Sequence, residues 1–348
     1  MNGRDSWLLY GANGYTGVLV AEEAKRRGMN PILAGRREGA VRPIAERLGF
    51  EWRAFELTPD ALRRGLDGAG AVLLCAGPFS VTSAPVVEAC LAARAHYLDI
   101  TGEIDVFEAC AARAAAAERA GVTVFPGVGF DVVPSDCLAL RLKEALPDAV
   151  ELDLAFYGEG TPSAGTAKTA VEGMVLGGRA RRDGRIVELP LGGKKLDVPF
   201  TSGVRRAVSI PWGDVSTAYR STGIPNITAY TVVSPAFVHL APVLRGALRV
   251  GFVRRAIGRW IERTVHGPDE KTRATARSHL WGRVTDAAGR TRSARLDTPE
   301  GYALTAVTAL ECTRRALAGK IRPGYTTPAL AFGSGFIAEF PGCAFRLD

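Results

Sequence analysis

Paired metal-ligand spacings are missing from this sequence. The six cysteines include no Cys-x-x-Cys pair, and the four histidines, at positions 96, 239, 266 and 279, have no zinc-site spacing. Most of the cysteines fall within apolar patterns. We therefore expect no metal and no disulfide framework, and buried free thiols of the kind typical of a reducing compartment.

Long apolar runs are also missing. The longest candidate, Val232 to Leu244, contains two prolines and a histidine and is followed by Arg245, so it falls short of the ~18 residues that a membrane span needs. At the N-terminus, Trp7 to Tyr10 is too short for the apolar core of a secretory signal. These observations predict a cytoplasmic protein.

Concentrated positive charge is absent although the net charge is +8 over 348 residues. The arginines are scattered, and no nucleic-acid-binding motif accompanies them. We therefore expect no nucleic-acid partner, which leaves a membrane surface or an anionic cofactor as the reason for the basic balance.

Three familiar catalytic patterns are missing as well. None of the eight tyrosines is followed four positions later by lysine, which excludes the proton relay of short-chain dehydrogenases. The sequence has no Gly-x-Ser-x-Gly nucleophile elbow and no His-Glu-x-x-His zinc motif. Serine-hydrolase and zinc-protease chemistry are therefore poor interpretations.

What the sequence does contain is a regular alternation of short β-rich runs and helical patterns over its first 130 residues. Strands are expected at 7–10, 31–34, 51–55, 71–75, 96–99 and 122–125, and helices at 15–27, 38–48, 59–66, 84–94 and 104–120. This alternation predicts βαβ units around a parallel sheet with helices on both faces. We assign residues 1–133 to a doubly wound, Rossmann-type α/β domain.

The regular alternation of strands and helices ends at Pro134. Residues 185–233 alternate polar and apolar positions, 279–286 and 290–296 suggest a hairpin, and 298–317 a helix. We assign 134–324 to a second, mixed α/β domain. The tail, 325–348, is expected to pack back onto the first domain.

The sharpest local signal is a glycine-rich loop that follows the first strand and opens a helix. It contains Gly11, Asn13, Gly14, Tyr15, Thr16 and Gly17. Such glycines permit the tight turn and the close approach of backbone to a pyrophosphate, which then sits on the N–H groups of the helix start. The loop predicts dinucleotide binding, and the alternative is a structural turn without a ligand.

The residues after the second predicted strand indicate whether the dinucleotide is NAD(H) or NADP(H). Where an NAD-selective site carries an acidic residue, this chain has Arg36 and Arg37, and no carboxylate comes before Glu38. A permanently charged guanidinium suits a ribose 2′-phosphate, so we predict NADP(H) as the cofactor. The alternative is a pair of solvated arginines.

The fourth strand ends in Cys75, Ala76, Gly77 and Pro78. Ligands of open α/β sheets lie at the carboxyl ends of strands, and these small or rigid residues suit contact with a cofactor. The alternative is a plain strand-to-helix connection.

Four groups of residues together resemble one known family. They are 11–17 with 34–36, 75–79 with 87–90 and 96–103, 127–136, and 324–329 with 332–333. With them the chain resembles the saccharopine dehydrogenase-like NADP-binding oxidoreductases, especially the branch containing the trans-acting enoyl reductases of mycobacterial lipid synthesis. The resemblance implies a nucleotide-binding domain followed by an α/β domain that covers the active site and often mediates dimers, so we expect a homodimer. It does not imply one reaction.

Three residues are candidates for the proton donor or oxyanion stabiliser that a hydride acceptor needs: Tyr97, Glu103 and Asp131. Each has an alternative, since Tyr97 fits a core position and both acids fit helix caps. Lys168 is a further candidate, for an acidic substrate group, with a solvated lysine as the alternative.

The segment 242–264 has apolar and arginine-rich faces at helical spacing. That pattern is typical of a helix lying on a membrane surface, or of a surface helix whose apolar side faces the core. Peripheral membrane contact is therefore one hypothesis for this segment.

The sequence thus predicts an NADPH-dependent reductase of an enoyl-type C=C bond in an apolar, lipid-like or natural-product substrate. A C=N reductase or saccharopine-type amino-acid dehydrogenase is the first alternative. A non-catalytic NADP-binding sensor or scaffold is the second.

Overall fold

The computed structural model describes residues 6–190, 192–233, 246 and 251–347. The chain divides into two compact units, each described separately below. The first comprises residues 1–133 and 302–331, and the second comprises 134–301 and 332–348.

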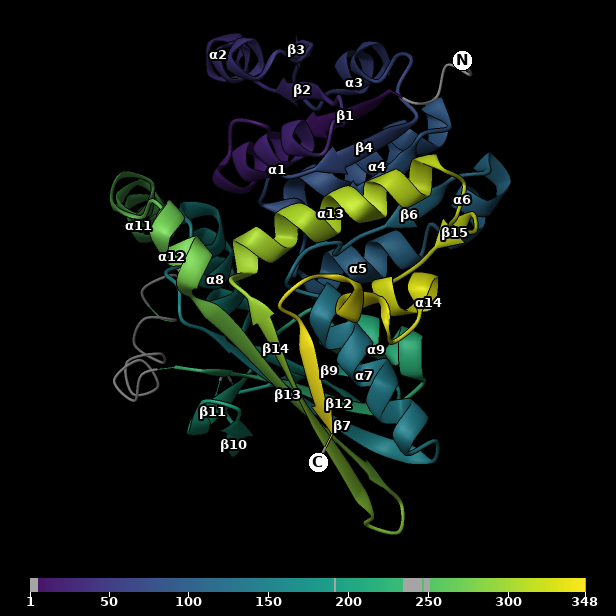
Figure 1. Cartoon of the computed structure of the whole chain (residues 1–348), viewed down its shortest axis with the longest axis vertical. Helices are drawn as coiled ribbons and strands as arrows, with labels where there is room; N and C mark the ends of the chain where they lie inside the picture. The colour runs from purple at the N-terminus through teal and green to yellow at the C-terminus, as the bar shows by residue number, and fades with distance from the viewer. Residues whose placement is uncertain (1–5, 191, 234–245, 247–250, 348) are drawn as a thin grey trace. The chain divides into compact units, whose positions relative to one another are not determined.

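The first unit is built on a seven-stranded parallel sheet with the order β15-β6-β5-β4-β1-β2-β3 (Figure 1). Its strands are β1 (Trp7–Tyr10), β2 (Ile32–Gly35), β3 (Trp52–Ala54), β4 (Ala71–Leu74), β5 (His96–Asp99), β6 (Thr123–Phe125) and β15 (Gly324–Tyr325). Its helices are α1 (Tyr15–Arg26), α2 (Glu38–Leu48), α3 (Pro59–Gly65), α4 (Phe79–Ala93), α5 (Ile104–Ala111), α6 (Ala114–Ala120), α13 (Gly301–Leu317) and α14 (Pro328–Phe332). The predicted Rossmann-type sheet is confirmed.

The strand order places the site of interest. From β1 the chain goes first to β2 and β3 on one side and then to β4, β5 and β6 on the other. β1 and β4 pair in register from Trp7 with Ala71 to Tyr10 with Leu74. The order therefore reverses between these two strands, and their carboxyl ends form the position where open α/β sheets bind ligands.

Fully buried aliphatic side chains hold this sheet together. Leu8, Leu33, Leu73 and Leu98 lie on neighbouring strands and are shielded from solvent. Strands of a parallel sheet are covered on both faces, which is why these runs are continuously apolar rather than alternating.

The second unit is built on a mixed nine-stranded sheet. The main path is β10-β11-β12-β7-β13-β14-β16, and β8 joins β12 to β9. The strands are β7 (Ala149–Gly158), β8 (Gly178–Arg182), β9 (Arg185–Leu189), β10 (Lys195–Phe200), β11 (Gly203–Ile210), β12 (Asn226–Val232), β13 (Arg277–Asp286), β14 (Thr291–Pro299) and β16 (Ala344–Leu347). The helices are α7 (Val133–Ala145), α8 (Ala164–Leu176), α9 (Asp214–Thr222), α11 (Gly251–Thr264), α12 (Glu270–Thr275) and the 3-10 turn η1 (Phe336–Glu339). The long hairpin of β13 and β14 is plain in Figure 1.

The C-terminal part of the chain differs from the sequence-based assignment. Residues 302–324, expected in the second domain, belong to the first unit. Of the tail 325–348, residues 325–331 do belong to the first unit, but 332–348 belong to the second, where β16 pairs with β14. The predicted helix 104–120 is also two helices, separated by Ala112 and Arg113.

Three expectations from the sequence concern a membrane span, the segment 242–264 and the cysteines. Among the described helices, none is both long and apolar enough to cross a bilayer. The hypothesis for 242–264 falls partly on residues 242–245 and 247–250, which lie outside the described residues. The six cysteines are free thiols, and four of them are buried.

Candidate functional site

The glycine loop after β1 is closely packed at its first and last glycines. Gly11 has a φ of +89°, and a Cβ atom there would lie 2.7 Å from the backbone nitrogen of Ala76. A Cβ atom on Gly17 would lie 2.1 Å from the carbonyl oxygen of Gly11. Both positions therefore require glycine, the first because of its backbone conformation as well.

The loop is tied to the neighbouring strands by backbone hydrogen bonds. The N–H groups of Gly11 and Ala12 donate to the carbonyl oxygen of Ala34 on β2, at 2.8 and 3.1 Å. The N–H of Cys75 donates to the carbonyl oxygen of Tyr10 at 2.7 Å. The predicted cofactor residues of the first, second and fourth strands thus meet at one edge of the sheet.

The helix that follows the loop begins without a side-chain cap. Its N-cap residue is Gly14, and no acidic residue lies in the first turn. Asn13 is exposed, and its Oδ1 lies 3.0 Å from where a Cβ atom of Gly35 would be. The ring of Tyr15 packs edge-on against Tyr302 at 4.9 Å between centroids, and Thr16 is half-buried beside it. The start of α1 keeps the positive potential that favours an anion.

Arg36 and Arg37 follow β2 at the same edge and are both exposed. Within the described part of the chain, neither forms an ion pair with a carboxylate. Burial raises the pKa of Tyr10 to about 12, and the positive charge of Arg36 opposes that rise, so this charge lies near the end of β1. Uncompensated guanidinium groups at this edge suit a phosphate ligand.

The segment after β4 turns sharply into α4. The hydroxyl of Thr82 donates to the carbonyl oxygen of Ala76 at 2.6 Å, which holds the turn. Gly77 is exposed, Pro78 is the N-cap of α4, and Cys75 is half-buried with a pKa raised by burial. The thiol is therefore a neutral packing group.

Glu103 caps a helix, but a different one from the helix that its sequence position suggested. Its Oε1 accepts the N–H of Phe79 and its Oε2 accepts the N–H of Ser80, each at 2.9 Å. These are the first residues of α4, whereas the helix next in sequence is α5. With both carboxylate oxygens engaged, the geometry favours a positioning role over proton donation.

Tyr97 lies in the core of the first unit with 0% of its surface exposed. Its hydroxyl donates a 2.6 Å hydrogen bond to Oδ2 of Asp99, whose Oδ1 accepts the N–H groups of Thr101 and Gly127. Burial raises the pKa of Asp99 to about 6 against the lowering effect of these hydrogen bonds. This placement favours a structural role for Tyr97, which joins β5 to the segment after β6.

Asp131 is the candidate acid with the most suitable surroundings. It lies half-buried in the turn before α7, and its Oδ2 would contact a Cβ atom of Gly102 at 2.9 Å. Its carboxyl group therefore lies against the segment that follows β5. Desolvation raises the pKa of this carboxyl group to about 7. A carboxyl group with this pKa can hold or release a proton near neutral pH.

Sequence reasoning missed the contribution of α13. The hydroxyl of Thr305 accepts the N–H of Phe130 at 3.0 Å, and the hydroxyl of Thr308 donates to the carbonyl oxygen of Val128 at 2.9 Å. These two hydrogen bonds fix the backbone of Val128 and Phe130, which directly precede Asp131. Two threonines inside a helix carry no such signal, because their partners lie about 180 residues away.

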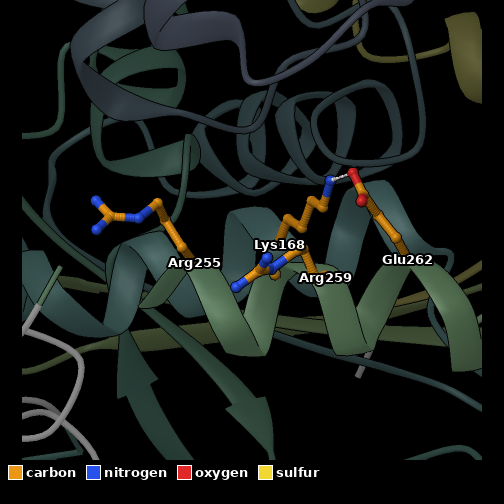
Figure 2. A pocket seen from close by; sticks show the side chains of 5 residues that line it. Lys168, Arg255, Arg259 and Glu262 are labelled. Carbon is orange, nitrogen blue, oxygen red and sulfur yellow. Dashed lines mark hydrogen bonds and ion pairs between the residues drawn. The ribbon is translucent and has the colours of Figure 1, made fainter. Parts of the chain in front are cut away.

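Lys168 lies in the second unit, on α8. It forms an ion pair with Glu262 on α11 (Figure 2). In the described part of the chain, no group of three His, Cys, Asp or Glu side chains is arranged to hold a metal ion.

Most of the first unit matches a known family model. Residues 7–125 match the family model of the saccharopine dehydrogenase NADP binding domain. This part of the chain is therefore similar to the NADP binding domain of saccharopine dehydrogenases. NADP(H) is therefore the cofactor of this NADP binding domain.

Curated relatives carry two kinds of name. The chain is 31% identical over 144 residues to a trans-acting enoyl reductase of Mycobacterium ulcerans, covering 37% of this chain and 33% of the relative. It is 30% identical over 192 residues to a saccharopine dehydrogenase-like oxidoreductase of Arabidopsis thaliana, covering 48% and 42%. The chain thus spans less than half the length of these relatives.

A solved structure matches along the whole chain. Apo saccharopine dehydrogenase (L-Glu forming) from Saccharomyces cerevisiae aligns over 99% of both chains with a TM-score of 0.69 and 12% identity. At that identity the similarity shows the shared fold, in which the NADP binding domain is followed by a mixed-sheet unit.

Proposed function

We propose that this protein is an NADPH-dependent oxidoreductase that reduces an electrophilic, enoyl-type C=C bond in a lipid-like or natural-product substrate. The NADP binding domain supports the cofactor, and the names of the mycobacterial relatives support the reaction. The observation that carries the proposal is the edge of the sheet where the glycine loop, Arg36 and Asp131 are found.

The residues at this edge fit NADPH. Gly11 and Gly17 leave no room for a side chain on the loop, and the uncapped start of α1 suits the diphosphate. Arg36 and Arg37, exposed and without carboxylate partners among the described residues, would hold the 2′-phosphate. Asn13, whose side chain lies against Gly35, would contact the cofactor next to these arginines.

Reduction of a C=C bond adds a hydride to one carbon and a proton to the other. The bound cofactor supplies the hydride. Asp131 would supply the proton, because desolvation raises the pKa of its carboxyl group to about 7 and the residue as a whole is only half-buried. Glu103 would act indirectly, by holding the turn that contains Ala76, Gly77 and Pro78.

The proposal is tested by following NADPH oxidation with matched panels of enoyl thioesters, enones and imines. Turnover of the C=C compounds supports the proposal. Turnover of imines alone would replace it with the C=N reductase of the saccharopine type. Tight NADPH binding without turnover of any panel member would favour a non-catalytic sensor or scaffold.

A further inference from the structure

The second unit contains a pocket of its own, between α8 and α11. Its volume is about 340 Å³, and it is lined by Lys168, Arg255, Gly258, Arg259 and Glu262 (Figure 2). Nothing in the proposed reductase mechanism uses these residues. Three of the five are cationic and one is anionic, so the pocket carries excess positive charge.

The charges in this pocket are only partly compensated. The ammonium group of Lys168 forms an ion pair with Glu262, and this contact lowers the pKa of the Glu262 carboxyl group. Among the described residues, Arg255 and Arg259 have no carboxylate partner. Figure 2 shows Lys168 meeting Glu262, Arg259 beside them, and Arg255 extending away along the helix.

Electrostatic repulsion between Arg255 and Arg259 destabilises the helix that carries them. Arg255 and Arg259 are four residues apart on α11, and like charges at this spacing repel one another. The helix is anchored on its other side by Ile261, which is 4% exposed. At Gly258 a Cβ atom would meet nothing within 4 Å, so the space between the two helices stays open.

We propose that this pocket binds a phosphate group, with Lys168 and Arg259 as its direct ligands and Arg255 as the third positive charge. Guanidinium groups donate two parallel hydrogen bonds to phosphate oxygens, and lysine adds a compact charge. Glu262 forms an ion pair with Lys168 and would be displaced by the incoming anion. This inference does not depend on the proposed reductase reaction.

The phosphate could belong to a soluble ester or to a lipid headgroup. Trp260, adjacent to Arg259, is 62% exposed, and an exposed tryptophan beside arginines is typical of helices that touch membrane surfaces. The chemistry of the pocket is the same in both cases. The two sources are therefore separated by experiment.

The test is calorimetric titration of inorganic phosphate into protein saturated with NADPH, so that phosphate does not compete at the glycine loop. Lys168→Gln and Arg259→Gln should each weaken phosphate binding about tenfold, the usual size of a lost charge-assisted hydrogen bond. Glu262→Gln should strengthen it roughly twofold to fivefold, because an exposed internal competitor is removed. Arg263→Gln, which removes the same charge from the same helix outside the pocket, should leave binding nearly unchanged.

Co-sedimentation with phosphatidylcholine vesicles, with and without phosphatidic acid, identifies the source. Binding only to vesicles with phosphatidic acid, lost in Arg259→Gln, supports the pocket and assigns a lipid headgroup. Phosphate binding without vesicle binding supports the pocket and assigns a soluble ester. If the protein binds neither inorganic phosphate nor vesicles, the proposal is overturned. Equal weakening by Arg259→Gln and Arg263→Gln also overturns it, as does a Glu262→Gln variant that binds no more tightly.

Discussion

Glu103 accepts the backbone N–H of Phe79 at 2.9 Å and so ties the end of β5 to the start of α4. Its second oxygen accepts the N–H of Ser80 at the same distance. One carboxylate therefore stabilises the turn that contains three predicted cofactor residues, although it lies more than 20 residues further along the chain.

Replacing Glu103 with alanine should lower the free energy of unfolding by about 1–2 kcal/mol, because two N–H groups in the first turn of α4 lose their acceptor. Glu103→Gln should cost less, since one acceptor oxygen remains. Urea denaturation measures both. Unchanged stability of both variants, together with lost turnover, would instead identify Glu103 as a catalytic acid.

Replacing Gly17 with alanine should weaken NADPH binding by roughly tenfold or more, because the added methyl group collides with the carbonyl oxygen of Gly11 and displaces the loop. Gly39 in α2 is the matched control, since a Cβ atom there meets nothing within 4 Å. Gly39→Ala should keep NADPH affinity and stabilise the protein by up to about 1 kcal/mol. Fluorescence titration with NADPH compares the two. Equal affinities would show that the loop does not contact the cofactor.

Asp131→Asn should lower turnover roughly a hundredfold while NADPH affinity stays unchanged, because proton donation is lost. In the wild type, turnover should fall as pH rises through about 7, where this carboxyl group loses its proton. Asp60→Asn, an exposed acid on α3, is the control and should change neither property. Full turnover in Asp131→Asn would remove this residue from the mechanism.

Asp131→Asn should also change how the free energy of unfolding depends on pH. The pKa of Asp131 is raised in the folded protein from 3.8 to about 7, so the folded state holds its proton more tightly than the unfolded state. Stability contributed by that proton is present below pH 4 and is lost as pH rises toward 7. Asp131→Asn should therefore gain stability relative to the wild type across this range. A constant difference between the two in thermal unfolding would contradict the raised pKa.

The first unit could be predicted well from the sequence because its signals are local. The strands Trp7–Tyr10 and His96–Asp99 have the predicted bounds, and the other four of the first six strands agree to within one residue at each end. The change of rhythm at Pro134 also coincides with the division between the units. Continuous apolar strands and a glycine loop can be recognised without knowing what packs against them.

What could not be predicted depends on partners that are distant in the chain. β15 is only two residues long and becomes a strand by pairing with β6. β16 is positioned by β14, about 50 residues earlier. The environments of Glu103, Asp131 and Thr305 likewise follow from tertiary contacts, so their residue types alone left capping and catalysis undecided.

The most direct test of the account is the dissociation constant of each reduced coenzyme, measured by calorimetry for the wild type and Arg36→Ala. We expect the wild type to prefer NADPH, and Arg36→Ala to weaken NADPH binding by roughly tenfold or more while NADH binding changes little, because only NADPH carries the 2′-phosphate. Arg63→Ala, at an exposed arginine on α3, should alter neither constant. Failure of the wild type to bind either coenzyme, or an equal loss of both in Arg36→Ala, would contradict the account.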